Sequence, residues 1–337
     1  MKKIENASLI ELNTFGIEAK AKLLIHYSSI NELSDLINTG VTDQGKLLHI
    51  GGGSNMLFLN DFDGLILHSQ IKFINLLSED DEHVLIEAGS GVNWDDFVAY
   101  CVIKGWGGIE NLSLIPGEVG ASAIQNIGAY GVEVCDTLVE VNTIHIQTGE
   151  VRKFNKDDCQ YAYRESIFKQ SLKGQYAITS VVFKLHKIPV FKLDYQHLEE
   201  EVLKNGEITL HNIRKTIIAV RESKLPDPKI TGNAGSFFMN PVLPREQFEN
   251  LLHSYPSMPH YFVSATEEKV PAAWLIDQCG WKGKTVGNAG VHSQQALVLV
   301  NTGGATGAEI AHIALLIKQS VLKTFSIQLI PEVNYII

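Results

Sequence analysis

A single serine separates a glycine from two aromatic rings in the stretch TGNAGSFFMNP, residues 231–241. Gly235 precedes Ser236, and Phe237 and Phe238 follow it. A hydroxyl beside apolar side chains is either satisfied by a nearby backbone group or kept dry for chemistry, where it could protonate a strongly basic centre. The stretch alone leaves both interpretations open.

A carboxylate near the carboxyl end, Glu332, presents a similar choice. It lies in IQLIPEVNYII, residues 327–337, which we expect to form a strand. Period-two alternation would place Glu332 on one face with Gln328 and Ile330. Because an unpaired carboxylate on a mostly apolar strand is costly to bury, Glu332 indicates either an exposed sheet edge or a group retained for proton transfer.

Two glycine-rich loops, GGGSN at 51–55 and GSGVN at 89–93, follow predicted strands. Glycine lets the backbone approach a ligand closely, and unpaired N–H groups can hold a phosphate. Neither loop completes the G-x-G-x-x-G pattern of dinucleotide-binding folds, because Met56 and Trp94 stand in the place of the third glycine. Each loop taken alone is also compatible with a plain turn.

A third stretch, IPGEVGASAIQNIGAYG at 115–131, is rich in glycine and alanine. So many small residues disfavour regular structure, since glycine costs a helix about 1 kcal/mol relative to alanine. A ligand that fills the missing side-chain volume, such as a flat ring system with a diphosphate tail, would explain the stretch. A tightly packed irregular loop is the alternative.

The elements that would position these groups make a mixed α and β protein whose composition changes near residue 200. A strand and a helix are expected over 22–40, with Ser29 and Glu32 as a capping box, and a hairpin turn at Thr148 and Gly149. Further helices are expected at 212–224, 271–280 and 306–325, and further strands at 176–187 and 295–301.

The composition describes an ordinary globular chain long enough for two or three domains, with 337 residues, 45% hydrophobic and 20% charged. A formal net charge of −10 disfavours nucleic acid as a partner. The four cysteines form no C-x-x-C pair, which disfavours a structural zinc site and a disulfide framework. Without an apparent signal peptide or membrane span, a cytoplasmic protein is expected.

Eight motifs, taken in order, make the chain resemble the UDP-N-acetylenolpyruvoylglucosamine reductases of peptidoglycan synthesis, in the longer subtype that has a tyrosine loop. The motifs are GGGSNMLF at 51–58, GIENLSLIPGEVGASAIQNIGAYGVEV at 108–134, YAYRESIFK at 161–169, KLPDP at 224–228, GNAGSFFMNP at 232–241, AAWLIDQCGWKG at 272–283, HSQQALVLVN at 292–301 and PEV at 331–333.

The resemblance implies an α+β fold: an FAD-binding fold of the vanillyl-alcohol-oxidase/PCMH type, made of two α/β subdomains, plus a third, substrate-binding α/β domain. The implied boundaries are 1–68 with 325–337 for the first FAD-binding subdomain, 69–212 for the second and 213–324 for the substrate-binding domain. Many relatives attach the flavin through a histidine in the first glycine loop. Here Ser54 follows the three glycines, which implies non-covalent FAD.

The implied reaction is the NADPH-dependent, FAD-mediated reduction of UDP-N-acetylglucosamine enolpyruvate to UDP-N-acetylmuramate. Hydride added at C3 leaves negative charge at C2, next to the substrate carboxylate, so the site needs electrophilic stabilisation and then a proton. By resemblance, Ser236 donates that proton to C2, Arg164 binds the carboxylate and stabilises the charge, and Glu332 is the catalytic glutamate.

The resemblance also implies binding residues. Those for the substrate are Tyr163, Tyr195, Lys224, Asn240 and Gln295. Those for FAD are Gly51, Gly52, Gly53, Ser54, Asn55, Ile115, Pro116, Gly117, Gly120, Ser122, Gln125, Asn126, Gly128, Ala129 and Tyr130. Met239 stands where many members of the family have a lysine, so one local positive charge that would favour the diphosphate or the nicotinamide is absent.

Two other functions stay open at this point. One is another flavin enzyme of the same fold, an oxidase or dehydrogenase acting on a sugar or lactone; the other is a non-catalytic nucleotide-binding protein. The twelve histidines suggest no ligand set, so we expect no catalytic metal and a structural role for His292. The expected partner is a UDP-sugar, with no nucleic acid or membrane, and the chain is expected to be a monomer.

Overall fold

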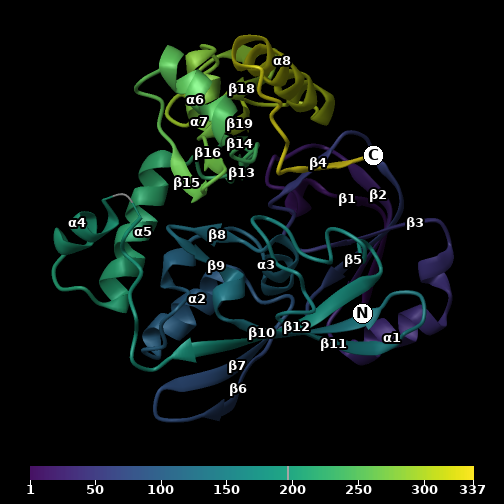
Figure 1. Ribbon diagram of the computed structural model, residues 1–337. Coiled ribbons are helices and arrows are strands. Elements are labelled where there is room, and N and C mark those ends of the chain that lie inside the picture. The colour runs from purple at the N-terminus through teal and green to yellow at the C-terminus, as the bar shows by residue number, and fades with distance from the viewer. Residues whose placement is uncertain (196) are drawn as a thin grey trace. The chain divides into compact units, whose positions relative to one another are not determined.

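The computed structural model describes residues 1–195 and 197–337, which divide into two compact units (Figure 1). The first unit comprises Met1–Ala7, Ala21–Gly53 and Asp63–Arg221, and the second comprises Ser8–Lys20, Ser54–Phe62 and Glu222–Ile337. Each unit therefore combines segments that are distant in the sequence. The three domain boundaries expected from the sequence stay a prediction.

The first unit carries a four-stranded sheet and one helix that packs on it. The sheet has the order β1 (Lys2–Ser8), β2 (Lys20–Tyr27), β5 (Phe62–Ser69), β3 (Lys46–Ile50). Strands β3 and β5 are parallel, with Ile50 opposite His68. Helix α1 (Ile30–Asn38) begins at the expected cap, since the Ser29 hydroxyl accepts a hydrogen bond from the Glu32 N–H at 3.1 Å.

A five-stranded antiparallel sheet forms the rest of the core of the first unit. Its order is β11 (Val151–Asn155), β10 (Leu138–His145), β12 (Tyr176–His186), β7 (His83–Gly89), β6 (Ile74–Glu79). Helices α2 (Trp94–Ile103) and α3 (Val119–Gln125) share one buried cluster with these strands. The expected hairpin at Thr148 and Gly149 is confirmed, because it joins β10 to β11. The unit is completed by β8 (Gly128–Ala129), β9 (Val132–Glu133), α4 (Leu198–Leu203) and most of α5 (Leu210–Lys224).

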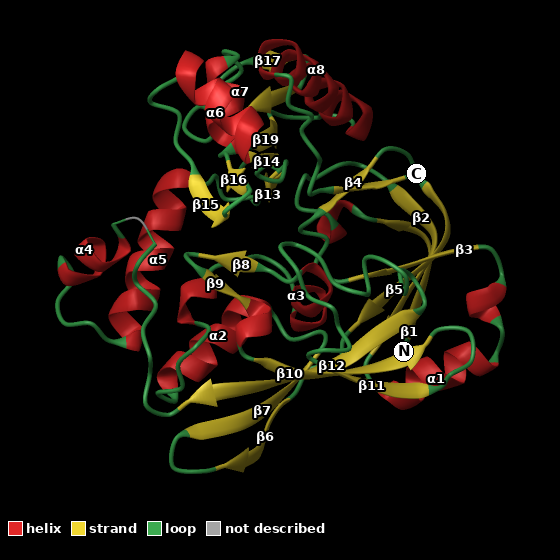
Figure 2. Cartoon of the chain, in the orientation of Figure 1, coloured by secondary structure: helices red, strands yellow, loops and turns green. Residues whose placement is uncertain are grey.

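The second unit has its own core, in which helices α6, α7 and α8 gather around short strands (Figure 2). One sheet has the order β13 (Asn233–Ser236), β19 (Val298–Asn301), β18 (Ala289–Val291), β17 (Thr285–Val286). A second has the order β14 (Val242–Pro244), β16 (Glu267–Lys269), β15 (Tyr261–Ser264), and β4 (Met56–Phe58) pairs in parallel with β20 (Asn334–Ile336). The helices are α6 (Arg245–Ser254), α7 (Ala272–Gln278) and α8 (Gly307–Phe325).

Helix α8 begins at the second capping box. Thr306 accepts a hydrogen bond from the Glu309 N–H, and the Glu309 carboxylate accepts one from the Thr306 N–H, as the sequence predicts. Gly307 is required there, because a Cβ on it would overlap the carbonyl group of Phe58. Among the described residues, none of the helices has the combination of length and apolar character that crossing a membrane requires.

The terminal segment corrects one expectation. Only β20 pairs as a strand there, and before it Pro331 forms a single bridge with Phe238. Hydrogen bonds join the strands on either side of this bridge, from Glu332 N–H to Phe237 and from Met239 N–H to Ile330, so Pro331 stands at a position whose N–H the pairing does not use. Leu329 is fully buried while Ile330 is 57% exposed. The apolar contacts thus lie on the face opposite to Gln328 and Ile330, and the burial argument for Glu332 fails.

Candidate active site

Backbone pairing within the second unit brings the segments of Ser236 and Glu332 together. Ser236 is the last residue of β13, and the next carbonyl, that of Phe237, accepts a hydrogen bond from the Glu332 N–H at 2.9 Å. The pairing continues where the Met239 N–H donates to the Ile330 carbonyl at 3.0 Å. Two groups proposed for proton transfer therefore come from neighbouring positions of one backbone pairing.

The surroundings of Ser236 do not match the expectation that apolar rings keep its hydroxyl dry. Phe237 and Phe238 are buried in the core of the unit, at 0% and 1% exposure, while the Ser236 side chain is exposed. The rings therefore anchor the strand and do not enclose the hydroxyl. Gly235 is needed for its left-handed φ of 67°, which strains other residues.

Asn233 is a residue whose positioning role the sequence did not reveal. It is 3% exposed, and its Nδ2 donates to the carbonyls of Pro226 and Thr231 at 3.1 and 2.8 Å. Its Oδ1 accepts from the Gly235 N–H at 2.9 Å. Asn233 thus ties the segment after Lys224 to the turn before Ser236, and an amide inside a stretch of small residues was the only signal in the sequence.

Three residues of this unit that were expected to contact the substrate are placed by the local structure around them. Lys224 is exposed at the end of α5, which stops before the prolines as expected. The Asn240 Oδ1 accepts from the Ala272 N–H at 2.9 Å and so caps the start of α7. The Gln295 Oε1 accepts from the Leu297 N–H at 3.4 Å. Their contacts with substrate stay predictions.

In the first unit, two of the glycine-rich stretches lie against each other. A Cβ on Gly52 would stand 3.5 Å from the Gly117 Cα, and a Cβ on Gly51 would stand 3.2 Å from the Glu118 Oε2. Gly53 and Gly117 both have positive φ, at 65° and 125°. Within residues 1–195 and 197–337, the N–H groups of Gly52 and Gly53 donate no hydrogen bond. This backbone-lined loop pair fits an anionic diphosphate, as the predicted FAD contacts require.

The loop at 89–93 has a different reason for its glycines. A Cβ on Gly91 would stand 2.6 Å from the Ser69 carbonyl oxygen and 3.0 Å from the Gln70 Cα. Close packing between backbones explains this loop, so it behaves as the plain turn that the sequence left open.

Two buried asparagines hold the loop after α3. Asn126 is fully buried, and its Nδ2 donates to Glu133 and to the Ala162 carbonyl while its Oδ1 accepts from the Cys135 N–H. Asn111, which sequence reasoning missed, donates from Nδ2 to the carbonyls of Tyr130 and Lys192 at 2.9 and 2.8 Å. The Asn126 side chain therefore supports the loop, and its contact with FAD stays a prediction.

Arg164 is fastened to the same loop. Its Nη2 donates to the Gly128 carbonyl at 2.6 Å and its Nη1 to the Asn126 carbonyl at 3.4 Å, and its own φ is 58°. The guanidinium also lies 5.1 Å from the ring centre of Tyr163. A Cβ on Gly128 would stand 2.8 Å from the Arg164 Nη1, which explains the glycine. The structure thus brings Tyr163 and Arg164 to the predicted coenzyme loop.

The other expected residues are distributed around these loops. The rings of Tyr195 and Tyr130 meet edge to face at 5.7 Å. Ser122 is buried, with its hydroxyl donating to the Val119 carbonyl, whereas Pro116 is exposed. Ile115, Gln125, Ala129 and Ser54 are partly exposed, whereas Gly120 is buried. In the second unit, the Asn55 Nδ2 donates to the Glu332 carbonyl at 3.2 Å.

The carboxylate of Asp95 holds the backbone at Leu114, just before the small-residue stretch 115–131. The Asp95 carboxylate accepts two hydrogen bonds from Arg214, at 2.6 and 2.9 Å, and one from the Leu114 N–H at 2.5 Å. Burial acts to raise the pKa of Asp95, but these bonds and the charges of Arg214 and Arg221 outweigh it and lower the pKa. Arg214 and Arg221 are seven apart on α5, a spacing that could have revealed their shared face.

No group of three or more His, Cys, Asp or Glu side chains in the described part of the chain is arranged to hold a metal ion. The Nδ1 atom of His292 is buried and lacks a hydrogen-bond partner.

Family models match both parts of the sequence. Residues 21–155 match an FAD binding domain, and residues 227–336 match the C-terminal domain of UDP-N-acetylenolpyruvoylglucosamine reductase. The first match agrees with the expected FAD-binding fold and with FAD as the cofactor. A solved structure of such a reductase from Thermus caldophilus shares the fold, with a TM-score of 0.67 at 20% identity, and the alignment covers 99% of this chain and 98% of that one.

Similar proteins with the same name extend over nearly the whole chain. The UDP-N-acetylenolpyruvoylglucosamine reductase of Bacteroides fragilis is 51% identical over 329 residues, with 98% of both chains covered. That of Flavobacterium johnsoniae is 48% identical, with 98% of both chains covered. That of Neisseria gonorrhoeae is 44% identical, with 97% of this chain and 96% of that one covered. The chain belongs to the UDP-N-acetylenolpyruvoylglucosamine reductase family.

Proposed function

We propose that this protein reduces UDP-N-acetylglucosamine enolpyruvate to UDP-N-acetylmuramate, a step of peptidoglycan synthesis, with NADPH as the reductant. The observation that carries the proposal is the backbone pairing that sets Ser236 beside the segment of Glu332. Family membership supports the reaction, and the FAD binding domain supports the cofactor.

The coenzyme supplies redox chemistry that the side chains lack. Bound FAD would supply the transfer of hydride from NADPH to C3 of the enolpyruvyl group. The chain would hold FAD without a covalent bond, through the N–H groups of 51–53 and the small-residue stretch 115–130. Ser54, rather than a histidine, follows these glycines, which supports non-covalent binding.

Ser236 is proposed to complete the reduction by donating its hydroxyl proton to C2. A serine hydroxyl is a weak acid, but a carbanion beside a carboxylate is a strong base, so the transfer is favourable. Gly235 and Asn233 hold the backbone that carries the hydroxyl. Glu332, as a neutral carboxylic acid, is proposed to donate a hydrogen bond to the developing enolate, because an ionised carboxylate would repel that charge.

Arg164 is proposed to bind the substrate carboxylate and stabilise its negative charge. Its two hydrogen bonds to the carbonyls of Asn126 and Gly128 fix the guanidinium before substrate arrives, which lowers the entropic cost of binding. Tyr163 packs against the guanidinium, and Tyr195 packs against Tyr130. Tyr163, Tyr195, Lys224, Asn240 and Gln295 are proposed as the further substrate contacts.

The decisive experiment measures NADPH oxidation by the FAD-loaded protein with and without UDP-N-acetylglucosamine enolpyruvate. We expect oxidation to depend on the UDP-sugar and to yield one UDP-N-acetylmuramate for each NADPH. Rapid oxygen consumption with a sugar or lactone, and none of this dependence, would instead identify another flavin enzyme of the same fold.

The proposed location is the cytoplasm, where NADPH and UDP-sugars are available. The four cysteines, which are all free, are compatible with a reducing compartment. The proposal includes a monomer that binds neither nucleic acid nor membrane, and sedimentation of the purified protein would test the monomer.

A further inference from the structure

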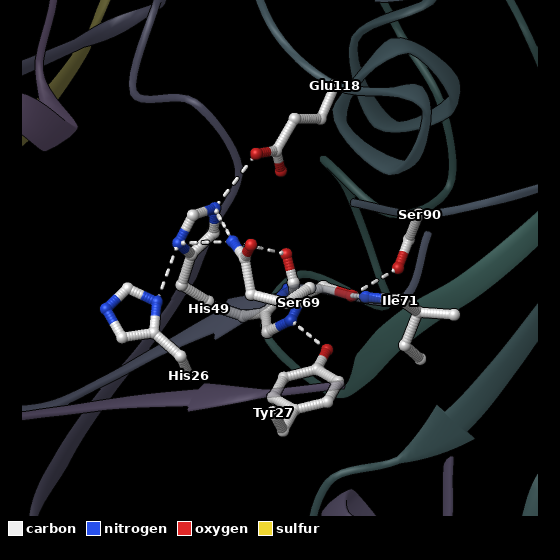
Figure 3. Close-up of polar contacts among 9 residues, drawn as sticks. His26, Tyr27, His49, Ser69, Ile71, Ser90 and Glu118 are labelled. Carbon is white, nitrogen blue, oxygen red and sulfur yellow. Dashed lines mark hydrogen bonds and ion pairs between the residues drawn. The ribbon is translucent and has the colours of Figure 1, made fainter. Parts of the chain in front are cut away.

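Three imidazoles and one carboxylate, those of His26, His49, His68 and Glu118, form a polar cluster in the first unit (Figure 3). His26 comes from β2, His49 from β3 and His68 from β5, and Glu118 directly precedes α3. The His68 Nε2 lies 2.9 Å from the Glu118 Oε1, and the His68 Nδ1 lies 3.1 Å from the His26 Nδ1. None of these four residues belongs to the groups assigned above to substrate, coenzyme or proton transfer.

The position of Glu118 is unfavourable for an anion-binding loop. Its side chain is 13% exposed, and its Oε2 lies 3.2 Å from where a Cβ would stand on Gly51. It also follows Gly117, which packs against Gly52. An ionised carboxylate at this place would repel a diphosphate held by the loop N–H groups, and the repulsion is strong because few waters screen it.

His68 is placed to cancel that charge. It is the residue before the last of β5 and stands opposite Ile50, which precedes the glycines, so the parallel pairing of β3 and β5 brings His68 to the sheet edge where the glycine loop begins. Its side chain is 7% exposed, which keeps the pair with Glu118 away from bulk solvent. Within the described residues, His68 is the one basic side chain in ion-pair contact with Glu118.

The remaining groups around His68 are neutral donors and acceptors. Burial lowers the pKa of His26, helped by the charges of His68 and Lys2. Burial, with the charge of His68, lowers the pKa of His49 to about 4, and its Nε2 lies 2.5 Å from the Tyr27 hydroxyl. A neutral His26 can accept the Nδ1–H of a protonated His68. The Gln70 amide nitrogen lies 3.3 Å from the same His68 nitrogen.

We propose that the His68–Glu118 pair is a charge-compensating positioning element for coenzyme binding: protonated His68 cancels the Glu118 charge and so lets the glycine loops hold the FAD diphosphate. The inference rests on the proposed assignment of these loops to FAD. It predicts that FAD affinity falls when His68 loses its proton, and that the loss requires the Glu118 carboxylate.

The test is a titration of the flavin-free full-length protein with FAD, followed by flavin fluorescence, which reads binding without turnover. His68→Gln keeps an N–H near the Nε2 position but removes the charge. We expect it to weaken FAD binding roughly tenfold, equivalent to about 1.4 kcal/mol. Glu118→Gln should bind FAD as tightly as the parent protein or more tightly, and the double variant should regain parental affinity.

The pH dependence gives a second readout. When the pH is raised across the range in which imidazoles in general lose their charge, about 5 to 8, the parental affinity should fall and that of Glu118→Gln should stay nearly constant. Tyr27→Phe is the matched control, because it removes a hydrogen bond within the same cluster without changing charge, and it should leave both readouts at parental values. If His68→Gln does not fold, the Glu118→Gln pH profile decides alone.

Three results would overturn the inference. Weak FAD binding that persists in the double variant would mean that His68 acts on structure and not on the Glu118 charge. A parental affinity that is the same at all these pH values, or a Glu118→Gln variant with the parental slope, would do so too. A parental protein that binds no FAD at any pH would instead refute the proposed function.

Discussion

The loop pair at 51–53 and 117–120 offers backbone groups to a ligand, whereas the region around Ser236 offers one side chain. In the loop pair two glycine backbones meet, since a Cβ on Gly52 would stand 3.5 Å from the Gly117 Cα. Around Ser236, a single exposed hydroxyl stands on a backbone held by the buried rings of Phe237 and Phe238. Backbone donors suit a ligand that must be held, whereas one positioned side chain suits a proton that must be moved. Substitutions should therefore affect binding in the first region and chemistry in the second.

Replacing the hydroxyl of Ser236 should have the largest effect. Ser236→Ala should slow reduction of the UDP-sugar roughly 100- to 10,000-fold, as expected when a general acid is lost. Reduction of FAD by NADPH should stay near its original rate, because the hydroxyl lies outside the loop pair. Stopped-flow absorbance of the two half-reactions measures this, and equal losses in both would contradict the assigned role.

Glu332→Gln should act on the same half-reaction with a smaller loss, roughly 100-fold, because an amide keeps the shape of the side chain but has no acidic proton to share with the enolate. The backbone pairing of Glu332 with Phe237 does not involve the side chain and is kept in the variant. Single-turnover oxidation of the reduced protein by the UDP-sugar gives the rate. Unchanged turnover would remove Glu332 from the mechanism.

Two glycine-to-alanine substitutions separate packing from ligand contact in the glycine loops. A Cβ on Gly91 would meet the Ser69 carbonyl at 2.6 Å, so Gly91→Ala should lower the free energy of unfolding by about 1–3 kcal/mol. A Cβ on Gly52 makes only an ordinary contact at 3.5 Å, so Gly52→Ala should keep its stability but bind FAD roughly tenfold more weakly.

Urea unfolding and FAD titration of both variants check this pair of expectations. Loss of stability in Gly52→Ala, with FAD affinity retained, would mean that the first loop is a packing turn like the second.

The Asp95–Arg214 pair should give a pH-dependent contribution to the stability of the first unit. Asp95→Asn should lower the free energy of unfolding by about 2 kcal/mol at neutral pH, since charged hydrogen bonds to Arg214 and Leu114 are weakened. The pKa of Asp95 is lowered in the folded protein, so this contribution is complete above its unfolded value, about 3.9, and is lost as the pH falls further.

The measurement compares urea unfolding of the parent and of Asp95→Asn between neutral pH and acid. The difference should shrink below about pH 4. Asp96→Asn is the control, because Asp96 is exposed one position along α2 and should change stability little at any pH. A difference that stays constant down to acid would show that the charge of Asp95 is not what stabilises the loop entry.

Sequence reasoning worked where the deciding contacts are local. The caps at Ser29 and Thr306 and the turn at Gly149 depend on partners within a few positions, and all three are confirmed. It failed at 327–333, where alternation suggested a strand but the segment forms only a single bridge, between Phe238 and Pro331. It also missed Asn233 and Asn111. Their side chains donate hydrogen bonds to backbone carbonyl groups, and only the folded chain brings those groups close to them.

The order of motifs and the positions of capping and turn residues determined the family, the cofactor and most helix ends. These depend on side-chain type and near-neighbour spacing, which the chain carries in one dimension. Only the tertiary structure decided which glycines meet a neighbouring backbone, that Phe237 and Phe238 anchor rather than enclose Ser236, and that His68 meets Glu118. Those outcomes depend on distances between segments far apart in the chain, and such distances exist only once the strands have paired.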